Sequence, residues 1–311
     1  MRRRVVLRYV NLTAARARDS SLGACPACLE ERRRPWFSHP RLTLWLCGRC
    51  GLGYSDPQPR GFVEQRYLHE YDLAAHFGKL EARKNTLIER RLDELAPPSG
   101  RRRLLDVGCA DGQFAAAAQA RGWHPAGVEL NPPAARRARE RGVEVSEGHL
   151  EDVALGDGAF DLITAWDVIE HVPEPREFAQ KITRLLARDG RAVVTTLNRR
   201  ALVAQVFRGR WTMVVEDHFT YWHERSLHSL FASSGLESVH SSSFGLGRDF
   251  VAWLDRPPVA RAGEPQVGDR SGVRARWDTR PVVLAAENAL NRALDVTALG
   301  VGIQVSFRHR R

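Results

Sequence analysis

The chain has 311 residues, 43% of them hydrophobic, which is enough for one large packed domain plus a small module and excludes global disorder. The formal net charge of +10 would suit a nucleic acid or an anionic membrane. However, only three basic residues are lysines, and such an arginine excess is equally typical of a GC-rich genome. No run of 18 uncharged apolar residues predicts a spanning helix, and Arg8 interrupts the short apolar N-terminal stretch, so we expect a cytoplasmic protein.

Residues 1–22 are expected to form a basic, mobile tail, because six arginines and no acidic residue precede Asp19. Residues 23–55 contain two C-x2-C turns separated by 18 residues, and they supply the four cysteines Cys25, Cys28, Cys47 and Cys50. This spacing predicts a zinc-ribbon-like module in which four thiolates close a tetrahedral shell. A closed shell leaves no position for substrate, so the zinc would be structural and would stabilise a segment too small for a core of its own. Two disulfides or free thiols are the alternatives.

Residues 56–100 read as a helical linker or cap that ends at Pro97, Pro98 and Gly100. From residue 101 to 311, strand and helix patterns alternate. Strands are predicted at 103–107, 124–130, 143–148, 160–166, 190–198, 236–244 and 301–310, and helices at 112–122, 131–142, 175–190 and 224–236. The alternation predicts an α/β fold with a doubly wound, mainly parallel, seven-stranded Rossmann-like sheet. Stretches 199–221 and 255–300 are read as insertions.

The segment LLDVGCADGQF, residues 104–114, joins the first of these strands to the first helix. It is no dinucleotide fingerprint, because Gln113 stands where the third glycine belongs, and it lacks the Gly-Lys-Ser/Thr ending of a P-loop. The small residues Gly108, Ala110 and Gly112 let the backbone approach a ligand closely. Glu129 ends the second strand, where an acid can accept both hydroxyls of a ribose. Together they predict a site for a nucleoside without pyrophosphate.

That loop, with GVELNP, GHLEDVALGDGAFDLITAWDVIEHVPEP and LLARDGRAVVTTLN, resembles the class I S-adenosylmethionine-dependent methyltransferases over about residues 104–198. The resemblance implies that Gly108, Ala110 and Gly112 face the methionine part of the cofactor and that Glu129 faces its ribose. It places His149 and Leu150 at the adenine edge, with Asp152 as a substitute for the acid that the family usually has at position 149. Asp106 and Trp166 complete the predicted cofactor site.

A narrower resemblance includes the cysteine pairs, GLGYSDPQP and FRGRWTMVVEDHFTYWHERSLHSLFASSGL. These resemble zinc-ribbon-bearing methyltransferases of bacterial secondary-metabolite and polysaccharide pathways, and the last stretch also resembles ubiquinone-pathway O-methyltransferases. The resemblance implies that His218 faces the active site as a base or substrate contact; alternatively it orders its own loop. Asp167, Glu170 and His171 match an element that holds a divalent ion in the ubiquinone group, although a similar Glu-His-Val triplet packs beside the cofactor in metal-free relatives.

The resulting functional hypothesis is methyl transfer to a hydroxyl oxygen of a small metabolite or sugar. An RNA methyltransferase that grips its substrate with the zinc ribbon and basic surface is the alternative, but the chain has no Asn/Asp-Pro-Pro-Tyr/Phe tetrad, which makes nucleic acid unlikely. A binding module that has lost the cofactor is the third possibility. The stretch 199–215 reads as a lid over the pocket or as a peripheral membrane contact.

Overall fold

The structure is a computed structural model that describes residues 24–38, 42–55, 67, 81–95, 102–208, 211–245 and 297–311. The predicted tail at 1–22 and most of 56–100 and 255–300 lie outside the described residues. In the main domain the chain forms seven strands: β4 (Arg103–Val107), β5 (His124–Glu129), β6 (Glu144–Glu147), β7 (Phe160–Trp166), β8 (Leu186–Leu197), β10 (Leu236–Phe244) and β11 (Gly302–His309). Its helices are α3 (Glu81–Glu94), α4 (Gln113–Ala120), α5 (Pro132–Glu140), α6 (Pro175–Leu185), α7 (Leu202–Phe207) and α8 (Glu224–Ser233).

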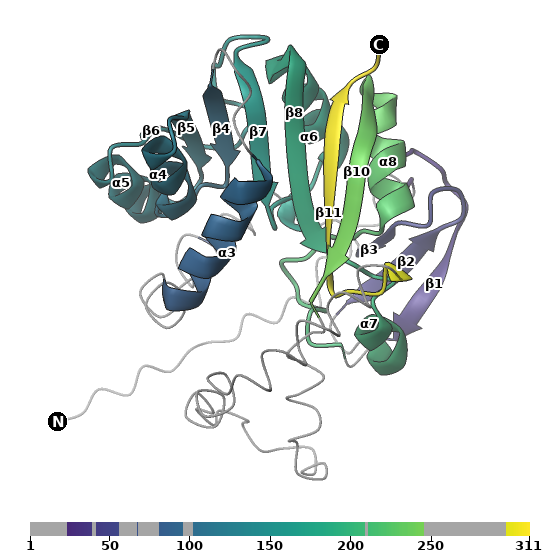
Figure 1. Cartoon of the computed structure of the whole chain (residues 1–311). Helices are drawn as coiled ribbons and strands as arrows, with labels where there is room; N and C mark the ends of the chain where they lie inside the picture. The colour runs from purple at the N-terminus through teal and green to yellow at the C-terminus, as the bar shows by residue number, and fades with distance from the viewer. Residues whose placement is uncertain are drawn as a thin grey trace, which may run out of the picture.

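The seven strands form one sheet in the order β10-β11-β8-β7-β4-β5-β6 (Figure 1). Neighbours from β8 to β6 are all parallel, and only β11 runs antiparallel, between β8 and β10. The predicted mainly parallel sheet of seven strands is therefore confirmed. The carboxyl ends of β4, β5, β7 and β8 meet at one edge, which is where ligands bind in such sheets.

Both faces of the sheet are covered, because successive side chains on a strand point to opposite sides. Leu104 of β4 packs in a cluster with Leu92 of α3 and Phe114 of α4. The next residue, Leu105, packs in a different cluster that contains Phe178 of α6 and Leu230 of α8. Helices α3 and α4 thus cover one face and α6 and α8 the other. Strands buried on both faces explain the nearly continuous apolar runs in the sequence.

The cysteine-containing segment forms a second sheet of four short antiparallel strands, in the order β1-β2-β3-β9. Three of them, β1 (Arg33–Ser38), β2 (Thr43–Cys47) and β3 (Gly53–Ser55), come from the N-terminal segment. The fourth, β9 (Thr220–Tyr221), comes from the end of the 199–221 insertion. We call residues 24–55 the cysteine module. Its sheet is completed by the main domain, so the two share hydrogen bonds as well as packing.

Three elements differ from or refine the prediction. The helix predicted over 175–190 ends at Leu185, and Leu186 begins β8 with extended backbone. The β7–β8 register shifts between Phe160 and Leu162, and β8 has extra residues there. Gly190 lies in this irregularity, where an added Cβ would come 2.9 Å from the Ala187 carbonyl oxygen. The helix predicted at 131–142 is confirmed, with Asn131 as N-cap accepting from the Ala134 N–H at 3.1 Å.

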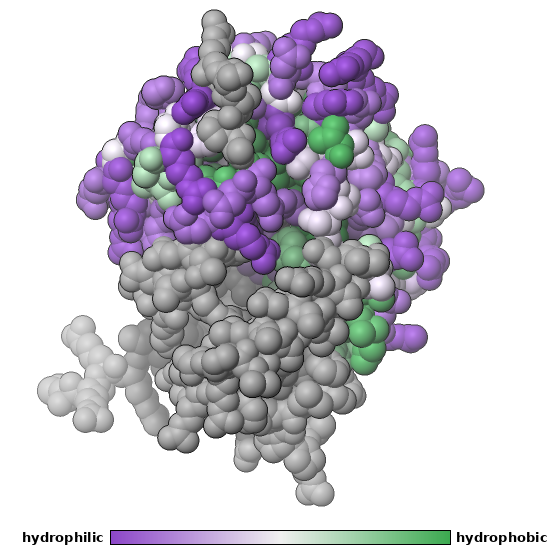
Figure 2. Space-filling view, in the orientation of Figure 1, coloured by the Kyte–Doolittle hydropathy of each residue, from purple (hydrophilic) through white to green (hydrophobic). Residues whose placement is uncertain are grey.

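Most of the described surface visible in Figure 2 is hydrophilic. A small hydrophobic area lies where Figure 1 shows α7, and there Leu202 and Val206 are 46% and 62% exposed. These residues are four apart and share one side of the helix. None of the helices among the described residues has the length and apolar content needed to cross a membrane.

Candidate active site

The loop after β4 has the close approaches that its small residues predict. Gly108, Ala110 and Gly112 all have positive φ, at 67°, 52° and 76°. An added Cβ on Gly108 would lie 2.7 Å from Val168 Cγ2, and one on Gly112 would lie 2.7 Å from Ala138 Cβ. Side chains are therefore excluded at both glycines by conformation and by space. The loop presents bare backbone at the ligand edge of the sheet.

Glu129 is 2% exposed and is held by the backbone of this loop and of α5. Its Oε2 accepts from the Ala110 N–H at 2.8 Å, and its Oε1 accepts from the Asn131 N–H at 2.7 Å. Burial raises its pKa, while these two bonds and one from the Tyr67 side chain oppose the rise. A carboxylate oxygen has two acceptor positions, so the carboxylate retains capacity for a diol. The arrangement fits the ribose of S-adenosylmethionine beside a loop of bare backbone.

Asn131 and Tyr67 were not singled out from the sequence. Asn131 stands in the GVELNP motif, and its Nδ2 donates to the Tyr67 carbonyl oxygen at 3.2 Å. Tyr67 belongs to the 56–100 segment, and no local pattern there indicates a contact with the end of β5.

The other predicted cofactor residues lie at the same edge but in different environments. Leu150 is buried in the core, His149 is partly exposed, and Asp152 is exposed. The Trp166 ring packs edge-on to Phe114, with a centroid separation of 5.1 Å, and the Arg91 guanidinium lies 3.9 Å above it. Trp166 Nε1 is buried without a hydrogen-bond partner among the described residues. A cofactor role for these four residues stays a prediction.

Asp106, within β4, is a buried carboxyl whose titration should be visible in stability. Its Oδ1 accepts from Thr164 Oγ1 at 2.7 Å, and burial raises its pKa to about 7. In the unfolded chain an aspartate has a pKa of about 3.9. The folded pKa is raised, so the stabilising contribution is complete below about pH 4 and is lost as the pH rises through 7.

We therefore expect the free energy of unfolding in urea to fall less between pH 5 and pH 8 in Asp106→Asn than in the wild type. The reason is that asparagine keeps the acceptor oxygen and has no proton to lose. Equilibrium unfolding in urea at several pH values would measure this. Asp157→Asn, at an exposed carboxyl, is the control and should leave the wild-type profile unchanged. Identical pH profiles for Asp106→Asn and wild type would show that Asp106 does not titrate in this range.

A second cluster joins residues that were predicted for two different roles. Glu170 and His171 lie on η2, a single 3-10 turn (Ile169–His171), and His218 lies on the segment before β9. One ligand atom of each lies within 4.8 Å of the others, and the two imidazole centroids are 4.7 Å apart. The Phe219 N–H donates to the Glu170 carbonyl oxygen at 2.8 Å, which fastens the His218 segment to η2.

Each imidazole has one ring nitrogen without a hydrogen-bond partner among the described residues. Nδ1 of His171 lies 2.8 Å from the Asp217 carbonyl oxygen, and Nδ1 of His218 lies 2.8 Å from the Met213 carbonyl oxygen. A carbonyl can only accept, so each Nδ1 carries the proton and each Nε2 keeps its lone pair. Burial lowers the pKa of both histidines, that of His218 to about 4 with a further contribution from His171. Both rings are therefore neutral at pH 7 and can accept a proton or bind a cation.

Glu170 and Asp167 limit the metal interpretation. Glu170 is 2% exposed, its Oε2 accepts from Thr196 Oγ1 at 2.9 Å, and burial raises its pKa to about 8. A cation would have to displace that proton. Asp167 does not share a helix face with Glu170 and His171, because the helical turn begins only at Ile169. Asp167 precedes η2 with φ 54°, and its Oδ1 accepts from Thr195 Oγ1 at 3.0 Å.

The four cysteines of the module lie together and form no disulfide. Sγ of Cys25 is 3.6 Å from that of Cys50, Sγ of Cys28 is 3.5 Å from that of Cys47, and all four are mutually within 4.8 Å. A tetrahedral zinc ion with Zn–S bonds of about 2.3 Å places its sulfurs about 3.8 Å apart, which fits these four residues. The Arg49 N–H also donates to Cys47 Sγ at 3.3 Å. A hydrogen bond from Cys25 lowers the pKa of Cys50 to about 5. A bound cation would take the place of the thiol proton in this contact.

Residues 79–241 match a family model described as a methyltransferase domain, and this match covers more than half of the chain. Ubiquinone biosynthesis O-methyltransferase from Aeromonas salmonicida (strain A449) is 27% identical over 147 residues, which are 43% of this chain and 62% of the relative. The protein of the same name from Cronobacter sakazakii (strain ATCC BAA-894) is 35% identical over 107 residues, 32% of this chain and 44% of the relative. The chain thus spans less than two thirds of these curated relatives.

Two solved structures share the fold. Geranyl diphosphate C-methyltransferase from Streptomyces coelicolor A3(2) aligns with a TM-score of 0.51 and 14% identity, over 82% of this chain and 99% of the other. A SAM-dependent methyltransferase from Archaeoglobus fulgidus aligns with a TM-score of 0.50 and 14% identity, over 80% and 99%. The matched family model begins at residue 79, so the cysteine module lies outside it.

Proposed function

This chain belongs to the methyltransferase-domain family, and from that membership we propose that it transfers the methyl group of S-adenosylmethionine to a hydroxyl oxygen of a small-molecule acceptor. The observation that carries the proposal is the pair of neutral imidazoles, His171 and His218, at the ligand edge of the sheet. Similarity to ubiquinone biosynthesis O-methyltransferases supports oxygen as the accepting atom.

Each residue of the site has its own role in this transfer. Bound S-adenosylmethionine supplies a methyl group on a positively charged sulfur, which leaves as a neutral thioether. Gly108 and Gly112 allow the loop to pass close to the cofactor, and Glu129 holds its ribose. His218 accepts the proton of the acceptor hydroxyl at Nε2 as the oxygen–carbon bond forms and the carbon–sulfur bond breaks. The carbonyl of Met213 fixes the tautomer that leaves Nε2 free.

We expect His218→Ala to lower turnover roughly 100-fold or more, the usual contribution of a general base, with S-adenosylmethionine affinity unchanged. Turnover follows from labelled-methyl incorporation, and affinity from calorimetry. His240→Ala is the matched control, because His240 is exposed on β10 and should keep full activity. Full activity in His218→Ala would remove this residue as the base. If magnesium raised the turnover of the wild type but not that of Glu170→Gln, the cluster of Glu170, His171 and His218 would instead be a metal site.

The acceptor class is tested by incubating the protein and labelled S-adenosylmethionine with a bacterial extract separated into small molecules and RNA. Label in the small-molecule fraction is the expected result. Label confined to RNA would contradict the proposal and support the nucleic-acid alternative. We also propose that Cys25, Cys28, Cys47 and Cys50 hold a structural zinc ion, on the strength of their mutual distances.

A further inference from the structure

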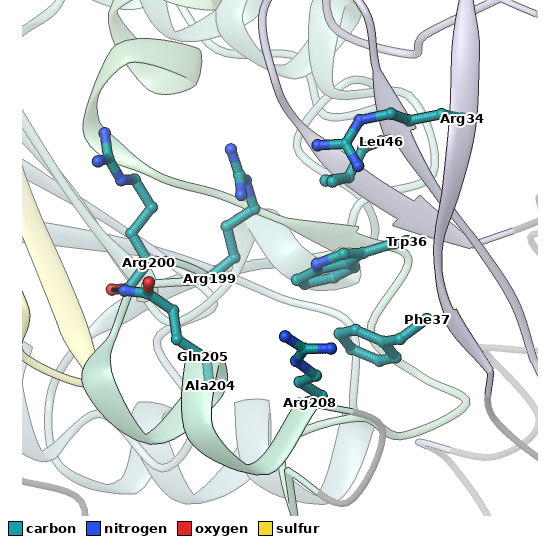
Figure 3. A pocket seen from close by; sticks show the side chains of 9 residues that line it. All are labelled: Arg34, Trp36, Phe37, Leu46, Arg199, Arg200, Ala204, Gln205 and Arg208. Atoms are coloured by element: carbon teal, nitrogen blue, oxygen red, sulfur yellow. Dashed lines mark hydrogen bonds between the residues drawn. The ribbon is translucent and has the colours of Figure 1, made fainter.

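A cavity of about 410 Å³ lies between the cysteine module and α7, apart from the glycine loop and the histidine pair. Four arginines line it: Arg34 on β1, and Arg199, Arg200 and Arg208 on the stretch that contains α7. Its aromatic wall is formed by Trp36 and Phe37 of β1. Figure 3 shows the Trp36 ring between the guanidinium groups of Arg34 and Arg208, with the Phe37 ring beside that of Arg208. We call this cavity the arginine pocket.

Among the described residues, no carboxylate offsets the charges of the arginine pocket, although attraction to the Cys50 sulfur opposes the lowering of the Arg199 pKa by burial. No aspartate or glutamate lines it, and among the described residues none of its four arginines forms an ion pair. Nε of Arg199 is buried and has no hydrogen-bond partner in the described part of the chain. Four like charges around one cavity repel each other, and a bound anion would offset that cost. The pocket is therefore electrostatically prepared for a ligand with several negative charges.

The chemistry of the lining narrows the ligand class. Guanidinium groups bind phosphate oxygens with paired hydrogen bonds, and they do so more specifically than lysine. The Trp36 and Phe37 rings, with centroids 4.3 Å apart and planes tilted by 40°, offer an apolar surface next to these charges. The volume lies in the range that encloses a small organic molecule rather than a bare ion. These features together suit a phosphate or diphosphate ester attached to a ring.

The arginine pocket adjoins the proposed acceptor site. Trp36 packs edge-on to Tyr221 with centroids 5.3 Å apart, and Tyr221 in turn lies 6.3 Å from the His218 ring. One aromatic side chain thus separates the pocket wall from the proposed base. Tyr221 is fully buried, so a ligand anchored by the arginines has to displace or pass this side chain to reach His218.

We propose that the arginine pocket binds the phosphate or diphosphate ester end of the methyl acceptor, an inference that rests on the proposed methyl transfer to a small molecule. The phosphate provides the anchor, and the ring or chain attached to it carries the hydroxyl to His218. The same phosphate chemistry occurs in lipid headgroups, and the exposed Leu202 and Val206 of α7 make a lipid source testable.

Calorimetric titration with two probes, inorganic pyrophosphate and uridine diphosphate, tests the proposal without any methyl transfer. Both should bind the full-length wild-type protein, with uridine diphosphate tighter because its ring contacts the aromatic wall. The double variant Arg34→Gln/Arg208→Gln should weaken both by roughly tenfold or more, since each arginine makes charge-assisted hydrogen bonds. Both side chains are exposed, so the variant should keep the wild-type melting temperature. Arg188→Gln, at an exposed arginine near the start of β8, is the matched control and should change nothing.

Several results would overturn the inference. One is that the wild type binds neither probe, and another is that the double variant binds both probes with wild-type affinity. A third such result is binding of phosphatidylglycerol vesicles without binding of the soluble probes. The last outcome would assign the pocket to a membrane surface. His218→Ala should bind uridine diphosphate as the wild type does. If His218 proves not to be the base, the binding result for the arginine pocket still stands, and a negative binding result leaves the test of His218 unaffected.

Discussion

Removing the proposed zinc ion from the purified protein with a strong chelator is expected to lower its melting temperature by roughly 5 °C or more, a loss of about 3 kcal/mol or more. Cys28→Ser should have the same effect, because three thiolates and a hydroxyl no longer close the shell. The cause is the size of the cysteine module, whose three short strands cannot bury enough apolar surface on their own.

The effect should extend beyond the module, since the module is joined to the proposed acceptor site. Strand β3 pairs with β9, and the Ser55 N–H donates to the Phe219 carbonyl oxygen at 2.9 Å. Phe219 is the residue after His218. Gly53 lies under Trp36, where an added Cβ would be 2.7 Å from the ring. Losing the metal would release these contacts and, with them, the position of His218.

We therefore expect metal loss to reduce methyl transfer strongly and S-adenosylmethionine affinity little, because the glycine loop and Glu129 lie on β4 and β5, outside the module. Metal analysis should find one zinc ion per chain in the wild type and in Cys109→Ala, whose thiol lies outside the cluster, and much less in Cys28→Ser. A zinc-free protein with wild-type melting temperature and turnover would refute both the metal and its role.

The sequence was sufficient to predict the main fold because its strands are buried on both faces and its helices begin and end with recognisable signals. Asn131 with two following prolines marks the start of α5, and Gly122 and Gly142 mark turns after α4 and α5. The end of α6 was misjudged because Leu186-Ala187 continues a helical pattern, and only the pairing with β7 draws these residues into the sheet.

Contacts between segments far apart in the chain could not be predicted from the sequence. Nothing local shows that Thr220 and Tyr221 complete the sheet of the cysteine module, or that His218 joins Glu170 and His171 rather than standing alone. The arginine pocket has the same origin, because Arg34 and Trp36 lie far along the chain from Arg199 and Arg208. The regularly spaced cysteine pairs and the strand-end motifs were predictable, whereas sites built from segments with no such spacing were not.

Glu129→Ala is expected to weaken S-adenosylmethionine binding by about 100-fold or more, since it removes the charged acceptor that we propose for two ribose hydroxyls, and each such bond contributes about 1.5–3 kcal/mol. It also leaves the buried N–H groups of Ala110 and Asn131 without their acceptor. The strained loop at Ala110, with φ 52°, should then lose order, which adds to the effect.

Two further variants separate the loss of ribose contacts from damage to the loop. Glu129→Gln keeps the shape but has one acceptor oxygen, so it can satisfy only one of the two backbone amides, and its affinity should fall between those of wild type and Glu129→Ala. Glu147→Gln is the matched control, because Glu147 is the register partner of Glu129 at the end of β6, exposed and paired with Arg139. It should bind the cofactor as the wild type does. Calorimetry gives the affinities and thermal unfolding without cofactor shows whether each variant is folded. A folded Glu129→Ala with wild-type affinity would mean that other residues hold the ribose. Glu129 would then serve only to hold the backbone of the glycine loop in place.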